Sequence, residues 1–245
     1  MVWSAGPGEP GIAGRGPDDA CRSPVIVLGL TGSIGMGKST AARMLRRMGV
    51  PLFDADAEVH GLLAPGGAAV AAVEATFPGV RDAAGHIDRR RLGERVFGKP
   101  EALRRLEGIL HPMVRAAERR FAARARARRE SLVVLDIPLL FETGGTGRCD
   151  YVLVVSAPAR LQRDRVIRRP GMSPGRFADI LGAQTPDREK RRRADFVVET
   201  ALGRRVTLRR LRAIVKILRQ GKRPHRARNR RGLTHGRGLR QCARS

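Results

Sequence analysis

Two kinds of hydrophobic pattern alternate along most of this chain. Continuous apolar runs, typical of buried strands, occur at residues 25–30, 50–53, 132–135, 151–155 and 196–198. Apolar residues at helical spacing predict helices at residues 38–48, 88–97, 113–129, 158–169 and 206–218. This alternation indicates βαβ units, and therefore an α/β fold with a mainly parallel sheet of about five strands between helical layers.

The two ends of the chain lack this pattern. Residues 1–23 are rich in Gly and Pro, and residues 219–245 contain many basic residues and no acidic one. We expect both ends to be disordered, the second as a basic tail, because neither can bury a core. The sequence therefore predicts one domain over residues 24–218.

The charge of the chain is strongly positive. Lys and Arg number 49 against 23 Asp and Glu, a net charge of +26. Such a field favours polyanionic partners, and weak nucleic-acid contact through the basic tail is one hypothesis. Aromatic residues make up only 4% of the chain, so no platform for stacking bases is evident. The sequence shows no apolar run of membrane-spanning length and no secretory leader, and we expect a cytoplasmic protein.

A glycine-rich loop lies between the first predicted strand and the first predicted helix. Gly32, Gly37, Lys38 and Ser39 satisfy the P-loop pattern G-x-x-x-x-G-K-[ST], and Gly35 adds a third glycine. Missing side chains let backbone amides converge on a polyphosphate, which indicates ATP as co-substrate. Lys38 would reach the β- and γ-phosphates, and the Ser39 hydroxyl is the expected ligand of Mg²⁺. A plain glycine turn would need neither side chain at these positions.

Carboxylates follow two of the predicted strands. Asp54 and Asp56 come after the second strand, and Asp136 closes the third in the manner of a Walker B residue. One of the first two is a candidate general base for a hydroxyl acceptor, whereas Asp54 could equally cap the next helix. Asp56 or Asp136 could support Mg²⁺ through water, although an apolar run that ends in Asp is a weak signal by itself.

Arginines at helical spacing precede a Pro- and Gly-rich break near residue 170. Arg165 and Arg169 are four residues apart, so we expect them to share one helix face and to close over the transferred phosphoryl group. These features predict a lid over about residues 160–186, which would exclude water from the reaction. For Arg163 and Arg168 a solvated charged face is the weaker alternative to a role in the lid.

The order of the motifs resembles one family. The P-loop is followed by Asp54-Ala-Asp56, His111-Pro112, the segment Pro138-Leu-Leu-Phe-Glu142, the two lid arginines and Ala194-Asp195-Phe-Val. This set, which covers about residues 25–218, resembles the dephospho-CoA kinases. The resemblance implies a P-loop kinase core with a helical substrate region and a lid. It also implies ATP-dependent phosphorylation of the ribose 3′-hydroxyl of dephospho-CoA, the last step of coenzyme A synthesis.

The resemblance also assigns residues to roles. Asp56 takes the position of the catalytic carboxylate, together with Lys38, Arg165 and Arg169. The residues expected to hold ATP are Gly32, Gly35, Met36, Gly37, Lys38, Ser39 and Thr40. Those expected near the dephospho-CoA substrate, besides Asp56, are His111, Pro112, Leu139 and Leu140, either as contacts or as packing.

One position departs from the family pattern. The family usually has an Asn close to a Gly after the last strand, where this chain has Thr200 and Gly203.

Two other functions are alternatives to this one. A kinase for a nucleoside or nucleotide would share the P-loop chemistry, but the middle of the chain favours dephospho-CoA. A nucleic-acid-binding protein would use the arginines and the tail on phosphate backbones.

Overall fold

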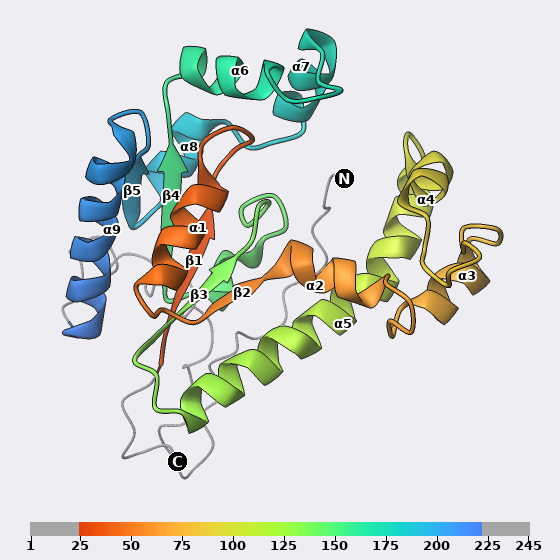
Figure 1. The fold of residues 1–245 in the computed structure, drawn as a ribbon, viewed down its shortest axis with the longest axis horizontal. Helices are drawn as coiled ribbons and strands as arrows, with labels where there is room; N and C mark the ends of the chain where they lie inside the picture. The colour runs from red at the N-terminus through yellow and green to blue at the C-terminus, as the bar shows by residue number, and fades with distance from the viewer. Residues whose placement is uncertain (1–24, 222–245) are drawn as a thin grey trace, which may run out of the picture.

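The computed structural model describes residues 25–221 and places a five-stranded parallel sheet at its centre (Figure 1). The strands are β1 (Ile26–Thr31), β2 (Leu52–Asp54), β3 (Leu132–Asp136), β4 (Tyr151–Ser156) and β5 (Phe196–Glu199), in the order β2-β3-β1-β4-β5. The helices are α1 (Lys38–Arg47), α2 (Ala55–Leu62), α3 (Val70–Thr76), α4 (Arg89–Val96), α5 (Pro100–Ala127), α6 (Ala159–Ile167), α7 (Pro174–Gly182), α8 (Asp187–Arg193) and α9 (Gly203–Arg219). A short 3₁₀ helix, η2, spans Gly145–Arg148.

Helices cover both faces of the sheet, because each strand is apolar on both sides. On one face α1 and α9 pack against alternate strand residues such as Leu28 and Leu153. On the other face α5 packs against the intervening residues, such as Val27 and Val152. Two-sided burial is the condition for a parallel sheet, and the predicted three-layer α/β/α fold is confirmed.

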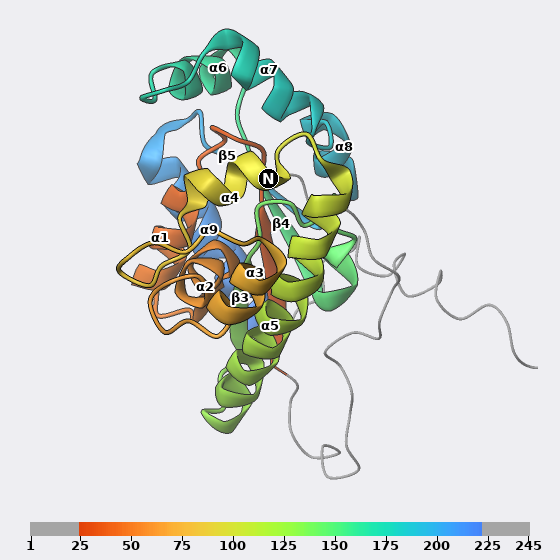
Figure 2. The same ribbon diagram turned by 90° about the vertical axis from the view of Figure 1, so that its right-hand side faces the viewer.

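A second, smaller core lies beyond the β2 end of the sheet. It is built by α3, α4, the end of α2 and the first half of α5, with Val73, Leu92 and Leu106 fully buried. On the opposite side, α6 and α7 extend over the ends of the strands (Figures 1 and 2). The helical region and the lid segment therefore stand on two sides of one sheet edge, as the resemblance implied.

The predicted strands agree with the structure to within one or two residues, but several helices do not. Helices α2, α3, α7 and α8 were not expected, and α6 ends at Ile167, before Arg169. The basic tail begins inside α9, which ends at Arg219. Residues 222–245 of that tail and residues 1–23 lie outside the described residues.

The longest helix corrects one expectation. A helix was predicted from Met113 onward, but α5 begins at Pro100 and passes through Pro112. Pro112 has no backbone N–H, so the carbonyl of Gly108, four residues earlier, loses its helical hydrogen bond. Gly108 is exposed, and water can donate to this carbonyl instead. The His-Pro pair therefore lies inside a helix and does not end one.

Within residues 25–221, no helix is both long and apolar enough to cross a bilayer.

Candidate active site

The loop after β1 has the backbone conformation of a phosphate cradle. A Cβ on Gly32 would lie 2.6 Å from Cγ2 of Val155 and 2.7 Å from its carbonyl oxygen, so only glycine fits there. Gly37 has a φ of 93° and precedes the first residue of α1. Lys38 and Ser39 then open α1, whose first amides are free of helical acceptors. The predicted P-loop residues are thus brought together at the carboxyl end of the sheet.

Lys38 and Asp136 form an ion pair at this edge. Nζ of Lys38 lies 2.8 Å from Oδ1 of Asp136, and the side chains are 17% and 4% exposed. Burial raises the pKa of the Asp136 carboxyl above its ordinary value, the ammonium of Lys38 opposes that rise, and Asp54 and Asp56 add to it. The carboxylate therefore depends on a nearby cation to remain charged at this depth.

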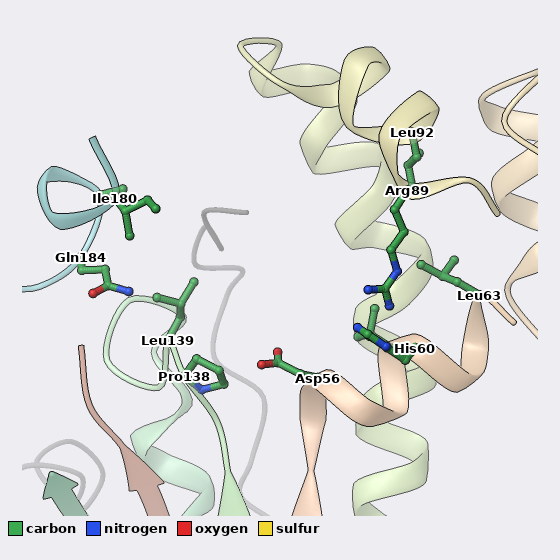
Figure 3. Close-up of a pocket in the computed structure, with 11 residues that line it drawn as sticks. Asp56, His60, Leu63, Arg89, Leu92, Pro138, Leu139, Ile180 and Gln184 are labelled. Atoms are coloured by element: carbon green, nitrogen blue, oxygen red, sulfur yellow. The ribbon is translucent and has the colours of Figure 1, made fainter. Parts of the chain in front are cut away.

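The two aspartates after β2 have different surroundings. Asp54 caps α2 by accepting a hydrogen bond from the amide of Ala57 at 3.1 Å, and its other oxygen lies 3.3 Å from Nη2 of Arg46. Asp56 lies in the first turn of α2, and its carboxylate points across a cavity toward Pro138 and Leu139 (Figure 3). Asp54 therefore caps α2, whereas the carboxylate of Asp56 faces the cavity.

This cavity, of about 400 Å³, lies between three parts of the molecule. The segment after β3 supplies Pro138 and Leu139, α2 and the residue after it supply Asp56, His60 and Leu63, α4 supplies Arg89 and Leu92, and the lid segment supplies Ile180 and Gln184 (Figure 3). Apolar side chains form most of its walls, with the polar groups of Asp56, His60, Arg89 and Gln184 converging among them. Such a lining is typical of a pocket for a small organic substrate.

Arg165 and Thr200 fasten the lid to the P-loop. Nη1 of Arg165 donates to the carbonyl of Gly35 at 3.3 Å and to the Thr200 hydroxyl at 2.9 Å, and Nη2 donates to the Thr200 carbonyl at 3.2 Å. The Thr200 hydroxyl in turn donates to the carbonyl of Met36 at 2.9 Å. Arg169 follows the end of α6 and is exposed, so the expectation that it shares a helix face with Arg165 is wrong.

Two glutamines hold the P-loop from the lid side. Nε2 of Gln162 in α6 donates to the carbonyl of Ile34 at 2.8 Å, and the Ile34 amide donates to Oε1 of Gln184 at 3.1 Å. Gln184, which follows α7, also lines the cavity. The lid therefore contacts both the phosphate loop and the cavity through neighbouring residues.

The segment after β3 joins the cavity wall to the base of the lid. The hydroxyl of Thr31 donates to the carbonyl of Pro138 at 2.9 Å, which fixes the turn. Glu142 accepts from the amide of Thr185 at 2.8 Å and lies 2.8 Å from Nζ of the fully buried Lys190 in α8. Glu142 thus acts as an anchor for the chain that leaves the lid.

Some of the expected substrate residues do not line the cavity. Leu140 is fully buried against the sheet, which indicates packing and not contact. His111 lies half-buried in α5, and burial lowers the pKa of its imidazole. Sequence reasoning missed Gln184, since only the folded chain shows which glutamine faces the site. It noted Thr200 only as a departure from the family pattern and gave Arg89 no role, whereas the fold places both at the site.

A phosphate loop with its lysine, a buried carboxylate on the neighbouring strand, and a lid above an acceptor cavity define a P-loop kinase. Comparison with known proteins identifies the kind of kinase. The family model for dephospho-CoA kinase matches residues 26–203, and the chain belongs to that family. The expected family, enzyme class and function are confirmed: the family catalyses the final step of coenzyme A biosynthesis, with ATP as co-substrate.

Curated relatives and solved structures agree with this assignment. The dephospho-CoA kinase of Rhodospirillum rubrum is 59% identical over 196 residues, covering 80% of this chain and 93% of its own. That of Paramagnetospirillum magneticum is 63% identical over 199 residues, covering 81% and 92%. A crystal structure from Thermus thermophilus has a TM-score of 0.63 at 36% identity, covering 79% of this chain and 97% of that one. The dephospho-CoA kinase structure from Campylobacter jejuni, at 24% identity and a TM-score of 0.55, supports the fold.

Proposed function

We propose that the chain transfers the γ-phosphoryl group of ATP to the ribose 3′-hydroxyl of dephospho-CoA, with Asp56 as the carboxylate that orients this hydroxyl and accepts its proton. The observation that carries the proposal is the position of Asp56, whose carboxylate faces the cavity while Asp54 is engaged as a cap. A hydroxyl acceptor needs such a group at the moment of transfer.

The P-loop residues supply the binding energy for ATP. The amides of Gly35 and Gly37 and those at the start of α1 would bind the β-phosphate, while the amide of Met36 donates to the carbonyl of Ser33 at 3.1 Å and shapes the turn. Lys38 would exchange Asp136 for the phosphate oxygens. When the Lys38 ammonium leaves Asp136, the buried carboxylate needs another cation beside it. The Ser39 hydroxyl and the Asp136 carboxylate, both hard oxygen donors at adjacent element ends, fit Mg²⁺.

Mg²⁺ held there would neutralise charge on the transferred phosphoryl group. No cluster of three or more His, Cys, Asp or Glu side chains that could hold a metal occurs among the residues described. Mg²⁺ commonly takes one or two protein oxygens, with phosphate and water completing its shell. The Ser39 and Asp136 pair suits that mode of binding.

Arg165 and Arg169 act at the lid in this proposal. Arg165 braces the P-loop through Gly35 and would therefore lie beside the bound phosphates, and Arg169, exposed after the end of α6, would be available when the lid closes. Both would stabilise charge on the transferred group. Closure of α6 and α7 would exclude water, which protects ATP from hydrolysis.

The acceptor lies against the cavity wall formed by Leu139, Ile180 and Leu92. His111 and Leu140 support this region by packing. We also propose that the protein works in the cytoplasm, where both substrates are found, and that contact of the basic tail with nucleic acid is weak and secondary.

The experiment that tests the proposal is an ATP-consumption assay with Mg²⁺ and parallel acceptors. Dephospho-CoA, adenosine, AMP, uridine and pantothenate are offered to the full chain, and the product is identified by mass. We expect turnover with dephospho-CoA far above the others and a new 3′-phosphate. A nucleoside or nucleotide as the preferred acceptor would contradict the proposal while leaving the P-loop mechanism intact.

A further inference from the structure

A row of cations runs along the outer face of α9, which lies on one flank of the molecule (Figure 1). The row consists of Arg205, Arg209, Arg212, Lys216 and Arg219, and all five side chains are exposed. Steps of four and three residues alternate along it, so the five side chains share one face of the helix over about 20 Å of its length. We call this row the α9 stripe.

The α9 stripe has no counter-charge in the part of the chain that the structure describes. Helix α9 contains no Asp or Glu, and no carboxylate of residues 25–221 forms an ion pair with the stripe. Nη2 of Arg219 donates one hydrogen bond, to the carbonyl of Gly49 at 3.4 Å. The basic helix α8 differs, because its Arg193 lies 3.1 Å from its own Glu189.

This arrangement lowers the stability of the free protein. Like charges three or four residues apart on a helix repel one another. Arg205 also lies in the first turn of α9, where the helix dipole disfavours a cation. A row of anionic groups laid along the stripe would remove both penalties, so the stripe suits a polyanion with regularly spaced charges.

Membrane surfaces and nucleic acids are both polyanions, and the surroundings of the stripe favour a nucleic acid. A helix that lies in a membrane surface inserts its apolar side among the lipids. That side of α9, which includes Leu211 and Leu218, is buried in the core of the protein. No aromatic residue occurs in α9, so bases have nothing to stack on, and the available contacts are those of cations with phosphates.

We propose that the α9 stripe binds the phosphate backbone of double-stranded nucleic acid without reading its sequence. A straight row of cations suits a straight backbone, and a duplex carries one phosphate charge for about every 1.7 Å of its axis. No stripe residue lines either cavity near Asp56, so the contact leaves the kinase site open. The proposal therefore does not depend on the proposed function. The basic sequence 222–245, which follows α9, adds to the contact but is not required for it.

The test measures binding of a fluorescent DNA duplex to the full chain by anisotropy at several salt concentrations. The stripe variant is the triple change Arg209→Gln/Arg212→Gln/Lys216→Gln. We expect a micromolar Kd for the wild type at about 0.1 M salt and a Kd about tenfold or more higher for the stripe variant. The slope of log Kd against log salt should fall by about one for each cation removed.

The matched control removes the same number of charges from another helix. It is the triple change Arg105→Gln/Arg120→Gln/Arg124→Gln, at exposed positions of α5. We expect its Kd to stay within about twofold of the wild type and its salt slope to stay the same. An equal loss of binding in the two triple variants would overturn the proposal, because overall charge would then explain the binding.

Further measurements separate folding and other partners from the proposed contact. The stripe variant should keep the kcat of the wild type and be at least as stable in urea unfolding, because the repulsion along α9 is reduced. The single change Arg212→Glu is a second variant and should weaken duplex binding more than Arg212→Gln does. Deletion of residues 222–245 should leave most of the binding, and its complete loss would overturn the proposal. Tighter binding to vesicles with anionic lipid, or to single-stranded RNA, than to the duplex would also overturn it.

Discussion

The hydroxyl of Thr200 lies 2.9 Å from the carbonyl oxygen of Met36, so the end of the last strand is tied directly to the phosphate loop. The same hydroxyl accepts a hydrogen bond from Arg165, and the Thr200 backbone carbonyl accepts another. At the position where the family usually has Asn close to a Gly, this chain therefore uses threonine to join the lid, the sheet and the P-loop.

Thr200→Val should weaken ATP binding. Valine keeps the shape of the side chain but can neither donate to Met36 nor accept from Arg165, so we expect the KM for ATP to rise about three- to tenfold. Thr200→Ser keeps the hydroxyl and should stay close to the wild type. A wild-type KM for ATP in the valine variant would contradict this role.

Lys38→Ala should abolish phosphoryl transfer and also destabilise the fold. Without the ammonium, the buried Asp136 carboxylate loses the partner at 2.8 Å that favours its charged form. We expect the free energy of unfolding to fall by about 2 kcal/mol at neutral pH. In the double variant Lys38→Ala/Asp136→Asn the carboxylate is gone, so stability should recover in urea unfolding while activity does not. A double variant as unstable as Lys38→Ala would contradict this explanation.

Asp56→Asn and Asp54→Asn should separate catalysis from capping. Asp56→Asn should reduce kcat by about a hundredfold or more and leave the Kd of ATP largely intact, because a general base acts mainly in the transition state. Asp54→Asn retains a capping side chain and should keep most of the kcat. Steady-state kinetics and ATP titration measure both effects, and a near-normal kcat in Asp56→Asn would exclude it as the base.

His111 should make the stability of the fold depend on pH. Burial lowers the pKa of its imidazole below the ordinary 6.5, with Arg115 and Arg148 acting in the same direction and Glu107 opposing them. As the pH falls through 6.5 toward the lowered value, the unfolded chain binds a proton before the folded one does. The free energy of unfolding should therefore fall with decreasing pH, by up to about 1.4 kcal/mol for each pH unit in this range.

His111→Gln isolates this contribution. The variant should show a shallower pH dependence between about pH 7.5 and pH 5 in urea unfolding, because glutamine does not titrate. Its kcat and KM at neutral pH should change little if His111 only packs. An unchanged slope would assign the pH dependence to other groups.

The features that the sequence predicted well depend on neighbouring residues. The strands are continuous apolar runs, and the glycines and lysine of the P-loop have fixed spacing, so both could be placed without knowing the fold. Helix α5 was harder, since Pro112 normally ends a helix and only an exposed carbonyl at Gly108 makes it tolerable. Helix α2 was missed because Asp54 and Asp56 were interpreted as carboxylates at a strand end. Capping of a following helix was considered for Asp54, but only as an alternative to a role as general base.

The parts of the site that could not be predicted depend on residues far apart in the chain. Arg165 and Thr200 are separated by 35 residues, and Ile34 and Gln184 by 150. In a chain with so many arginines, the sequence assigned none to the acceptor cavity, and the fold places Arg89 there. Packing of the lid and the helical region against one sheet edge creates these contacts.

The two glutamines that bracket Ile34 join both α6 and the segment after α7 to the phosphate loop. Gln162 and Gln184 bond the carbonyl and the amide of one residue, so movement of α6 and α7 away from the P-loop breaks both hydrogen bonds together. Arg165 adds a third link, since it donates to the carbonyl of the next residue, Gly35. The backbone of Ile34 and Gly35 therefore couples the position of the lid to the shape of the loop, so that a change in one is felt by the other.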